Sequence, residues 1–344
     1  MENTRGQYLF THLSGEDIYL FRLRNTKGTE VCITNYGAII TSFTVLESDG
    51  ASNNIVLGFD DVKEYLADNY LSSYPYFGAV IGRYANRIKN AEFYLGDKKY
   101  KLAKNKAPDH LHGGESGFDK KVWKLKSYSD KKLSLCYRSV DGEEGYPGNL
   151  DTEILFELTE ENELIYEFFG HTDRATAINL THHSYFNLNN GNGTIGSHEV
   201  ALHAGKILAQ DNNFVATGHT TPVAGTRYDF TQAKRIERDW LPADGYDQSY
   251  VLTREGIDHV AAEAYSEASG LRLKIFTSEP VVHFYTGKWI PQMVSGSGKT
   301  YGPFSGLCFE TQKHPNAVNL PNAPNTILQP GETYHTKTIY RVSS

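Results

Sequence analysis

Apolar and polar residues alternate with a period of two along several stretches of this 344-residue chain. The alternation is clearest over residues 150–158, and it recurs over 133–137, 271–275 and 335–342. Because successive side chains of a β-strand point to opposite faces of a sheet, this pattern predicts strands buried on one face. Turn-forming pairs such as Asn190-Gly191 separate the stretches, as expected for antiparallel sheet.

Helical periodicity is scarce. It is confined to Asp60 through Ala67 and to Thr231 through Arg238, where Thr231 is the candidate N-cap. Many short strands with glycine-rich turns and few short helices predict an all-β fold, a sandwich or a barrel. The low-complexity patch at residues 295–298 is too short to link two domains. We therefore expect residues 1–344 to form a single large domain of antiparallel sheet.

Composition and charge restrict the class of protein. Apolar residues make up 39% of the chain and charged residues 22%, values typical of a soluble globular protein. A net charge of −7 without a basic cluster argues against nucleic acid as a partner. Met1 to Arg5 begin no apolar signal segment, and no run approaches the roughly 18 apolar residues of a membrane helix. We expect a cytoplasmic protein that does not bind membranes.

Cysteine and aromatic content add two constraints. Cys32, Cys136 and Cys308 are odd in number and widely spaced, which predicts neither a disulfide framework nor a cysteine metal site. The chain has 23 tyrosines and 17 phenylalanines. Most are expected to pack in strands, where aromatic residues are favoured. A few are expected to line a sugar pocket, where an aromatic ring stacks on C–H groups.

Two adjacent histidines lie in a strand-like run over residues 179–188. Neighbouring residues of a strand point to opposite faces, so only one of His182 and His183 can face a given site. The other is expected to pack or to support the site from behind. Two histidines on opposite faces of a regular strand cannot bind one metal, and the chain has no metal-ligand spacing such as H-E-x-x-H. No metal and no cofactor are predicted.

One carboxylate lies in an otherwise uncharged segment, Cys308-Phe309-Glu310-Thr311-Gln312. By alternation Glu310 shares a face with Cys308 and Gln312 and lies opposite Phe309. Burying a carboxylate there is costly unless the group is paired or used. A histidine and a glutamate held together form the minimal pair for general acid–base catalysis.

Weaker candidates are His112 before two glycines, the pair Asn86-Arg87, and Asp247 near Gly245. Each has an ordinary alternative: a loop histidine, a surface salt bridge and a turn former, respectively. The glycines after His112 allow a tight turn and a close approach to a ligand. The chain has no G-x-S-x-G motif and no glycine-rich phosphate loop, so neither a serine hydrolase nor a nucleotide-binding protein is predicted.

Several segments together resemble one protein family along nearly the full chain. In chain order these are Thr34-Asn35-Tyr36-Gly37-Ala38, Gly82-Arg83-Tyr84-Ala85-Asn86-Arg87-Ile88, Leu111-His112-Gly113-Gly114, Gly142-Glu143-Glu144-Gly145-Tyr146-Pro147-Gly148, Asn179 to Leu188, Phe284-Tyr285-Thr286-Gly287 and Phe309-Glu310-Thr311-Gln312. Each segment is modest alone, but in this order they are highly specific. The chain resembles aldose 1-epimerases (mutarotases) of the galactose mutarotase type.

This resemblance implies a large antiparallel β-sandwich of the galactose mutarotase type, with few short helices and the active site in a cleft on one face. It implies an isomerase of galactose and hexose metabolism, active without a cofactor as a monomer or homodimer. Its partner would be a free aldose such as galactose or glucose, whose α and β anomers it interconverts.

Residue by residue, Glu310 matches the general base that takes the C1 hydroxyl proton, and His183 matches the acid that protonates the ring oxygen. Where the family holds sugar hydroxyls or the ring oxygen, this chain has His112, Asn86, Arg87 and Asp247.

At two positions the chain departs from the family pattern. Relatives often have Asn at the position of His182, and many have Gln at the position of His283. Each departure replaces an amide by an imidazole, and His283 is therefore a candidate substrate-binding residue.

Two alternative functions remain open. One is epimerisation of another sugar, either a disaccharide with a free reducing end or a hexose 6-phosphate. A phosphate would favour added Arg or Lys in the cleft, and the matching segments supply only Arg83 and Arg87. The second alternative is a carbohydrate-binding sandwich without activity. Such a module would not need both Glu310 and His183.

Overall fold

The computed structural model describes residues 6–47, 50–241, 244–296 and 298–344, so Met1 to Arg5 lie outside the described part. Three antiparallel sheets contain most of the strands. The nine-stranded sheet has, in spatial order, β11 (Lys124–Tyr128), β12 (Lys132–Ser139), β13 (Leu150–Leu158), β14 (Glu163–Thr172), β30 (Tyr334–Ser343), β24 (Arg272–Thr277), β23 (Val260–Tyr265), β18 (Glu199–Leu202) and β21 (Lys234–Arg235). The six-stranded sheet has β17 (Tyr185–Phe186), β28 (Leu307–Gln312), β25 (Val281–Tyr285), β22 (Asp247–Val251), β19 (Lys206–Gln210) and β20 (Ala216–Pro222). The five-stranded sheet has β1 (Gln7–Thr11), β2 (Asp17–Arg24), β3 (Glu30–Thr34), β4 (Ile40–Leu46) and β5 (Ser52–Asn54).

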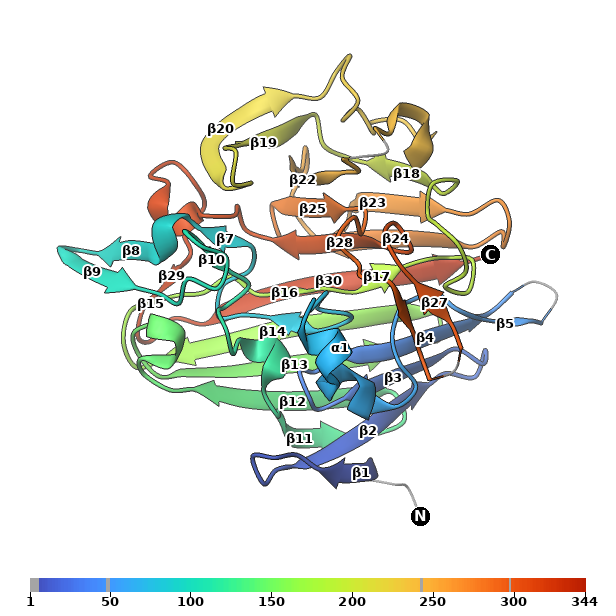
Figure 1. Ribbon diagram of the computed structural model, residues 1–344, viewed down its shortest axis with the longest axis horizontal. Coiled ribbons are helices and arrows are strands. Elements are labelled where there is room, and N and C mark those ends of the chain that lie inside the picture. Colours follow the sequence, from blue (N-terminus) through green and yellow to red (C-terminus); the bar gives the residue numbers. More distant parts are fainter. Residues whose placement is uncertain (1–5, 48–49, 242–243, 297) are drawn as a thin grey trace.

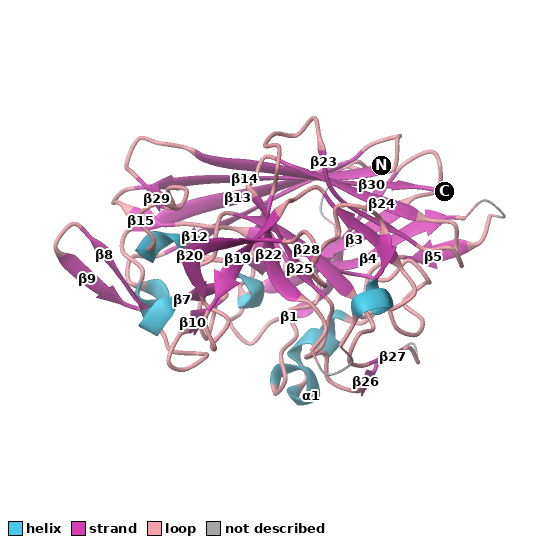
Figure 2. Ribbon diagram, turned by 90° about the horizontal axis from the view of Figure 1, so that it is seen from above, coloured by secondary structure: helices cyan, strands magenta, loops and turns pink. Residues whose placement is uncertain are grey.

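These sheets form a sandwich (Figures 1 and 2). Strands of the nine-stranded sheet make one layer, and strands of the other two sheets make the layer below it in Figure 2. The largest cluster of buried apolar side chains draws on all three sheets and includes Phe43 of β4, Phe168 of β14 and Phe309 of β28. The predicted all-β sandwich is therefore confirmed.

The strand predictions agree closely with the structure. Alternation over 150–158 corresponds to β13, whose even-numbered side chains are buried while the odd-numbered ones are half-buried or exposed. The other three predicted stretches lie within β12 and β30 or overlap β24. Alternation identifies these strands because each has one face on the core.

Helices are short throughout the described residues. The predicted Asp60–Ala67 helix is a 3₁₀ turn over Val62–Leu66, capped by the Asp61 side chain and followed by α1 (Asp68–Leu71). The other 3₁₀ turns are Lys89–Ala91, Phe118–Lys120, Glu143–Gly145, Ile236–Asp239 and Ala317–Asn319.

The predicted helix over Thr231–Arg238 is wrong. Lys234 and Arg235 form β21, which pairs with Glu199 and Val200 of β18, and only Ile236–Asp239 make a 3₁₀ turn. Thr231 is no N-cap, because its N–H and hydroxyl both donate to Asp229. The exposed sheet edge of β18 supplies partners that override the local helical pattern.

Five two-stranded ribbons complete the fold: β6 (Val80–Ile81) with β16 (Thr181–His182), β7 (Arg87–Ile88) with β10 (His110–Leu111), β8 (Glu92–Leu95) with β9 (Lys98–Lys101), β15 (Thr176–Ala177) with β29 (Ile327–Leu328), and β26 (Met293–Val294) with β27 (Thr300–Tyr301). Among the described residues, no helix has the length and apolar content needed to cross a membrane.

Candidate active site

The two faces of the six-stranded sheet have different surroundings. Phe284 and Phe309, on one face of β25 and β28, stack at 5.6 Å between ring centroids and belong to the core between the layers. Residues of the opposite face, including Tyr285 and Glu310, line an open cavity of about 570 Å³. All seven residues singled out from the sequence line this cavity: Asn86, Arg87, His112, His183, Asp247, His283 and Glu310.

Three neighbouring strands position the acidic side of the cavity. In the antiparallel register, His283 of β25 lies directly opposite Glu310 of β28 and opposite Ser249 of β22. Asp247 is two residues from Ser249 on the same face of β22, so it is the diagonal neighbour of His283. Sheet register therefore brings two carboxylates and an imidazole together.

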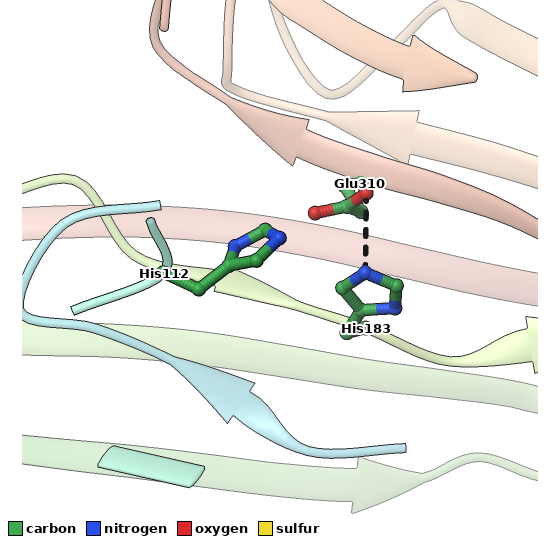
Figure 3. Close-up of side chains that lie close together, drawn as sticks. All are labelled: His112, His183 and Glu310. Atoms are coloured by element: carbon green, nitrogen blue, oxygen red, sulfur yellow. Dashed lines mark ion pairs between the residues drawn. The ribbon is translucent and has the colours of Figure 1, made fainter. Parts of the chain in front are cut away.

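Glu310 and His183 both line the cavity, and Figure 3 shows their side chains facing each other. His183 Nε2 is 3.6 Å from Glu310 Oε1, and their side chains are only 4% and 2% exposed. The other carboxylate oxygen, Oε2, has no partner within the protein. Burial lowers the pKa of His183 below its ordinary 6.5, and the Glu310 carboxylate offsets part of that shift. An acid–base pair is thus close together, with one carboxylate oxygen still available.

The two adjacent histidines point in opposite directions. His183 lines the cavity, whereas the His182 ring lies 6.0 Å from Phe156 and 5.6 Å from Tyr166, measured between centroids, on the core side. Burial lowers the pKa of His182 to about 3. His182 is therefore a neutral packing residue, as strand alternation predicts for one of the pair.

His112 is held by the backbone of Asn86. The Asn86 N–H donates to His112 Nδ1 at 3.2 Å, and the His112 N–H donates to the Asn86 carbonyl at 3.0 Å. Since Nδ1 accepts, the proton of the neutral ring is on Nε2. Burial and the neighbouring His183 and Arg87 hold the pKa of His112 well below 6.5. His112 is therefore a neutral N–H donor in the cavity.

The glycines after His112 serve the protein's own packing. A Cβ on Gly113, at φ +88°, would come within 1.7 Å of the Gly82 carbonyl oxygen, and one on Gly114 would meet the Glu144 carboxylate at 2.1 Å. Both glycines thus allow a close approach of the chain to itself, and the expected close approach to a ligand stays a prediction. This contact fixes the loop that presents His112.

Asp247 and His283 form a buried ion pair. His283 Nε2 is 2.9 Å from Asp247 Oδ1, and Nδ1 is 2.8 Å from the Ser249 hydroxyl. Burial alone would lower the pKa of His283, but the Asp247 bond and the Glu310 charge raise it above 6.5. Burial alone would raise the pKa of Asp247, but the bond to His283 and the charges of His283, Arg87 and His183 together lower it. The Asp247 carboxylate and the His283 imidazole thus favour each other's charged forms.

The two arginines of the matching segments have different surroundings. Arg87 lines the cavity. Arg83 is 2% exposed and donates to the carbonyl oxygens of Pro147 and Gly148 at 2.9 and 3.0 Å. Lys106 also lines the cavity. Of the two arginines, only Arg87 is available to a ligand in the cavity, since the Arg83 guanidinium holds together buried loops.

Aromatic residues of the cavity were not singled out from the sequence. The Tyr76 ring is stacked on His183 at 5.8 Å and lies 4.8 Å from His112, and Tyr185 is 4.9 Å from His183, all between centroids. Tyr185 lies two residues after His183, and Tyr285 two residues after His283, so alternation offered a signal for both. Tyr76, at φ +62° in a loop, offered none.

His112, His183 and Glu310 also place ligand atoms within 4.8 Å of one another, a group that could hold a metal ion. The hydrogen bond from Asn86 to His112 Nδ1 leaves the proton on Nε2. Binding a metal through that nitrogen would move the ring proton to Nδ1, where it would face the Asn86 N–H and the hydrogen bond would be lost. The donor set suits proton transfer better than metal coordination.

Comparisons with known proteins agree with this architecture. A family model described as Aldose 1-epimerase matches residues 19–341. Galactose mutarotase from Homo sapiens is 38% identical over 317 residues, covering 91% of each chain. Aldose 1-epimerase from Escherichia coli is 31% identical over 336 residues, covering 95% of this chain and 96% of that one. An aldose epimerase homologue from C. elegans superposes with a TM-score of 0.88 at 28% identity, covering 95% of this chain and 99% of that one.

The fold is a β-sandwich, and a buried histidine and glutamate lie close together in an open cavity. Together with relatives that match nearly the whole chain, these features define a carbohydrate-converting isomerase. The chain belongs to the aldose 1-epimerase family. The sequence resemblance is thereby confirmed at the level of family and enzyme class.

Proposed function

We propose that the protein interconverts the α and β anomers of free aldoses such as galactose and glucose, with Glu310 as general base and His183 as general acid. The observation that supports this most directly is the 3.6 Å separation of His183 Nε2 and Glu310 Oε1, on two buried side chains that line the cavity. The hydroxyl and the ring oxygen of a cyclic aldose are bonded to the same carbon, C1. Because His183 and Glu310 are also close together, one can reach the ring oxygen while the other reaches the C1 hydroxyl.

Proton transfer then runs in two steps. The Glu310 carboxylate takes the proton of the C1 hydroxyl while His183 gives a proton to the ring oxygen, and the C1–ring oxygen bond breaks to leave an open-chain aldehyde. Rotation about the C1–C2 bond turns the other face of the aldehyde toward the C5 hydroxyl. On closure His183 takes the C5 hydroxyl proton and Glu310 returns its proton to the carbonyl oxygen. The enzyme ends as it began.

Turnover depends on which member of the His183–Glu310 pair carries the proton when the sugar binds. Productive substrate binding needs an imidazolium at His183 and a carboxylate at Glu310. Burial works against the imidazolium, and the neighbouring carboxylate works for it. The remaining cavity groups hold the sugar: Arg87 and the His112 Nε2–H as donors, and the Asp247 carboxylate as acceptor, with His283 fixing Asp247 and Asn86 fixing His112.

The test is polarimetry of freshly dissolved α-D-galactose and α-D-glucose with the wild type, Glu310→Gln and His183→Asn. We expect the wild type to accelerate the approach to anomeric equilibrium, and each variant to lose about 100-fold or more in kcat, the scale of general acid–base catalysis. Glu279→Gln is the matched control, because Glu279 is equally buried but pairs with Lys313 and does not line the cavity.

Calorimetric titration with galactose separates this proposal from a binding module without activity. An enzyme keeps measurable sugar affinity in Glu310→Gln while turnover is lost. Sugar binding by the wild type without any acceleration would contradict the proposal.

Three further expectations are part of the proposed function: one domain over the whole chain, a monomer or homodimer, and a cytoplasmic location. Limited proteolysis, light scattering and cell fractionation test them in turn.

A further inference from the structure

The second nitrogen of the His183 ring faces a cysteine. Cys308 Sγ is 3.5 Å from His183 Nδ1, while His183 Nε2 is 3.6 Å from Glu310 Oε1. Figure 3 shows Nδ1 on the side of the ring that points away from Glu310. The imidazole is therefore held between a thiol and a carboxylate, and the proposed reaction assigns no role to the thiol.

Sheet register places the thiol beside the ring. Cys308 of β28 pairs with Tyr185 of β17 on one side and with Tyr285 of β25 on the other. His183 comes two residues before Tyr185, and Glu310 comes two residues after Cys308, so the thiol and the carboxylate share one face of β28. Cys308 is fully buried and does not line the cavity, so it acts on a sugar through the His183 ring and not by contact.

The proposed mechanism keeps a proton on His183 Nδ1 throughout turnover. The imidazolium gives its Nε2 proton to the ring oxygen, and the neutral ring that remains takes the C5 hydroxyl proton at the same nitrogen. Nδ1–H is therefore a buried donor that needs an acceptor. A hydrogen bond with the His183 backbone favours the protonated ring, and the Cys308 sulfur is the side-chain atom that faces Nδ1.

A thiol sulfur is a weak acceptor, which suits a group that has to release a proton. His283 provides the contrast, because its Nδ1 is 2.8 Å from the Ser249 hydroxyl and its Nε2 is bonded to Asp247. Burial lowers the pKa of both imidazoles, but only in His283 do the bond to Asp247 and the neighbouring charges raise the pKa above 6.5. Sulfur orients the His183 ring without holding its proton strongly.

Cys308 itself stays a neutral thiol. Burial and the charges of Glu310 and Asp247 raise its pKa well above the ordinary 9.0. The other titratable groups around His183 are unchanged in the test below. Three of them act on the ring through their charges: Glu310, Asp247 and His283. Burial keeps the others neutral, by lowering the pKa of an imidazole and raising that of a phenol: His112, His182, Tyr76, Tyr185 and Tyr285.

We infer that Cys308 is a positioning residue of the catalytic acid: its sulfur accepts the hydrogen bond from His183 Nδ1–H and thereby aims Nε2 at the ring oxygen of the sugar. This inference rests on the proposed function and extends it to a residue that touches no substrate. No bond to sulfur forms or breaks, so the thiol is unchanged by the reaction.

The test uses two substitutions that separate hydrogen bonding from packing. Cys308→Val fills the space of the thiol without an acceptor, and Cys308→Ser keeps an acceptor in a smaller side chain. Cys32→Val is the matched control, because Cys32 is also a buried cysteine of a strand, β3, and does not line the cavity. Polarimetry with α-D-galactose from about pH 5 to 9 gives kcat and KM. NMR of the imidazole C–H signals follows the titration of His183, which is assigned by its absence in His183→Asn.

In Cys308→Val we expect kcat to fall about fivefold to tenfold, the rate equivalent of one hydrogen bond. KM for galactose should stay within about twofold, because the groups that hold the sugar are intact. The alkaline limb of the kcat/KM profile and the His183 titration should move to lower pH by about 0.5, because sulfur binds the charged ring more strongly than the neutral one. Cys308→Ser should keep most of kcat and move both to higher pH, and Cys32→Val should match the wild type.

Two results would overturn the inference and leave the proposed function intact. The first is a His183 titration in Cys308→Val that does not move, whatever its kcat. The second is the reverse order of activity, with Cys308→Ser impaired and Cys308→Val unaffected, since that order reports packing alone. If Cys308→Val does not fold, Cys308→Ala takes its place with the same expected shifts. If the wild type accelerates neither galactose nor glucose, the proposed function itself has failed, and the inference fails with it.

Discussion

His283 faces Glu310 directly across the β25–β28 ladder while its imidazole bonds to Asp247 of β22 at 2.9 Å. One imidazole thus lies among two carboxylates, and their charges raise its pKa above 6.5. An amide at this position could not carry charge. Under the proposed function, sugar binding therefore depends on a titratable group.

The first prediction concerns His283→Gln. The raised pKa of His283 means that the folded protein favours its charged imidazolium. The contribution of this imidazolium to stability and binding is therefore fully present below pH 6.5 and is lost as pH rises through the folded-state pKa. We expect KM for galactose to rise with alkaline pH in the wild type and to stay flat in His283→Gln. Steady-state polarimetry from about pH 6 to 9 measures this. The same rise in both proteins would contradict the assignment.

The second prediction concerns His182→Asn. Burial lowers the pKa of His182 from 6.5 to about 3, so the unfolded chain binds a proton that the folded protein does not. The free energy of unfolding therefore decreases as pH falls below 6.5, by about 1.4 kcal/mol per pH unit for this group. Urea unfolding at a series of acidic pH values should show this slope reduced in His182→Asn. His219→Asn, at an exposed histidine of β20, should keep the wild-type slope.

The third prediction concerns Arg83→Met. The substitution leaves the buried carbonyl oxygens of Pro147 and Gly148 without their donor. Each unsatisfied group costs about 1–3 kcal/mol, so we expect the free energy of unfolding to fall by more than about 3 kcal/mol. Arg138→Met is the control: this arginine is 59% exposed in its ion pair with Asp151, and its loss should cost at most about 1 kcal/mol. Similar urea midpoints for the two variants would count against a structural role for Arg83.

The fourth prediction concerns Gly113→Ala. Its Cβ would overlap the Gly82 carbonyl, so the loop must move and carry His112 away from Glu310. We expect a loss of stability above about 3 kcal/mol, or a folded protein with strongly reduced kcat/KM. Gly96→Ala also has positive φ, but it has no atom within 4 Å, and it should cost only about 1 kcal/mol. Unchanged activity and stability in Gly113→Ala would show that the contact is dispensable.

Local patterns were sufficient where one strand face packs on the core. Alternation marked β13 from end to end and separated His182 from His183, because side-chain direction in a strand depends only on residue parity. The local pattern over Thr231–Arg238 predicted a helix that does not form, because Lys234 and Arg235 pair instead with the edge of β18. That pairing depends on a strand more than thirty residues away in the chain.

By itself, the sequence determined an all-β fold through its periodicity, while the resemblance of its short motifs indicated the sandwich, the family and the seven candidate residues. Only the tertiary structure decided that β22, β25 and β28 lie side by side, that His112, His183 and Glu310 converge, and that Arg83 lies outside the cavity. Strand order and register are long-range pairings, which no local pattern encodes. The charge states follow from the same cause, because burial and neighbouring charges exist only once distant segments have met.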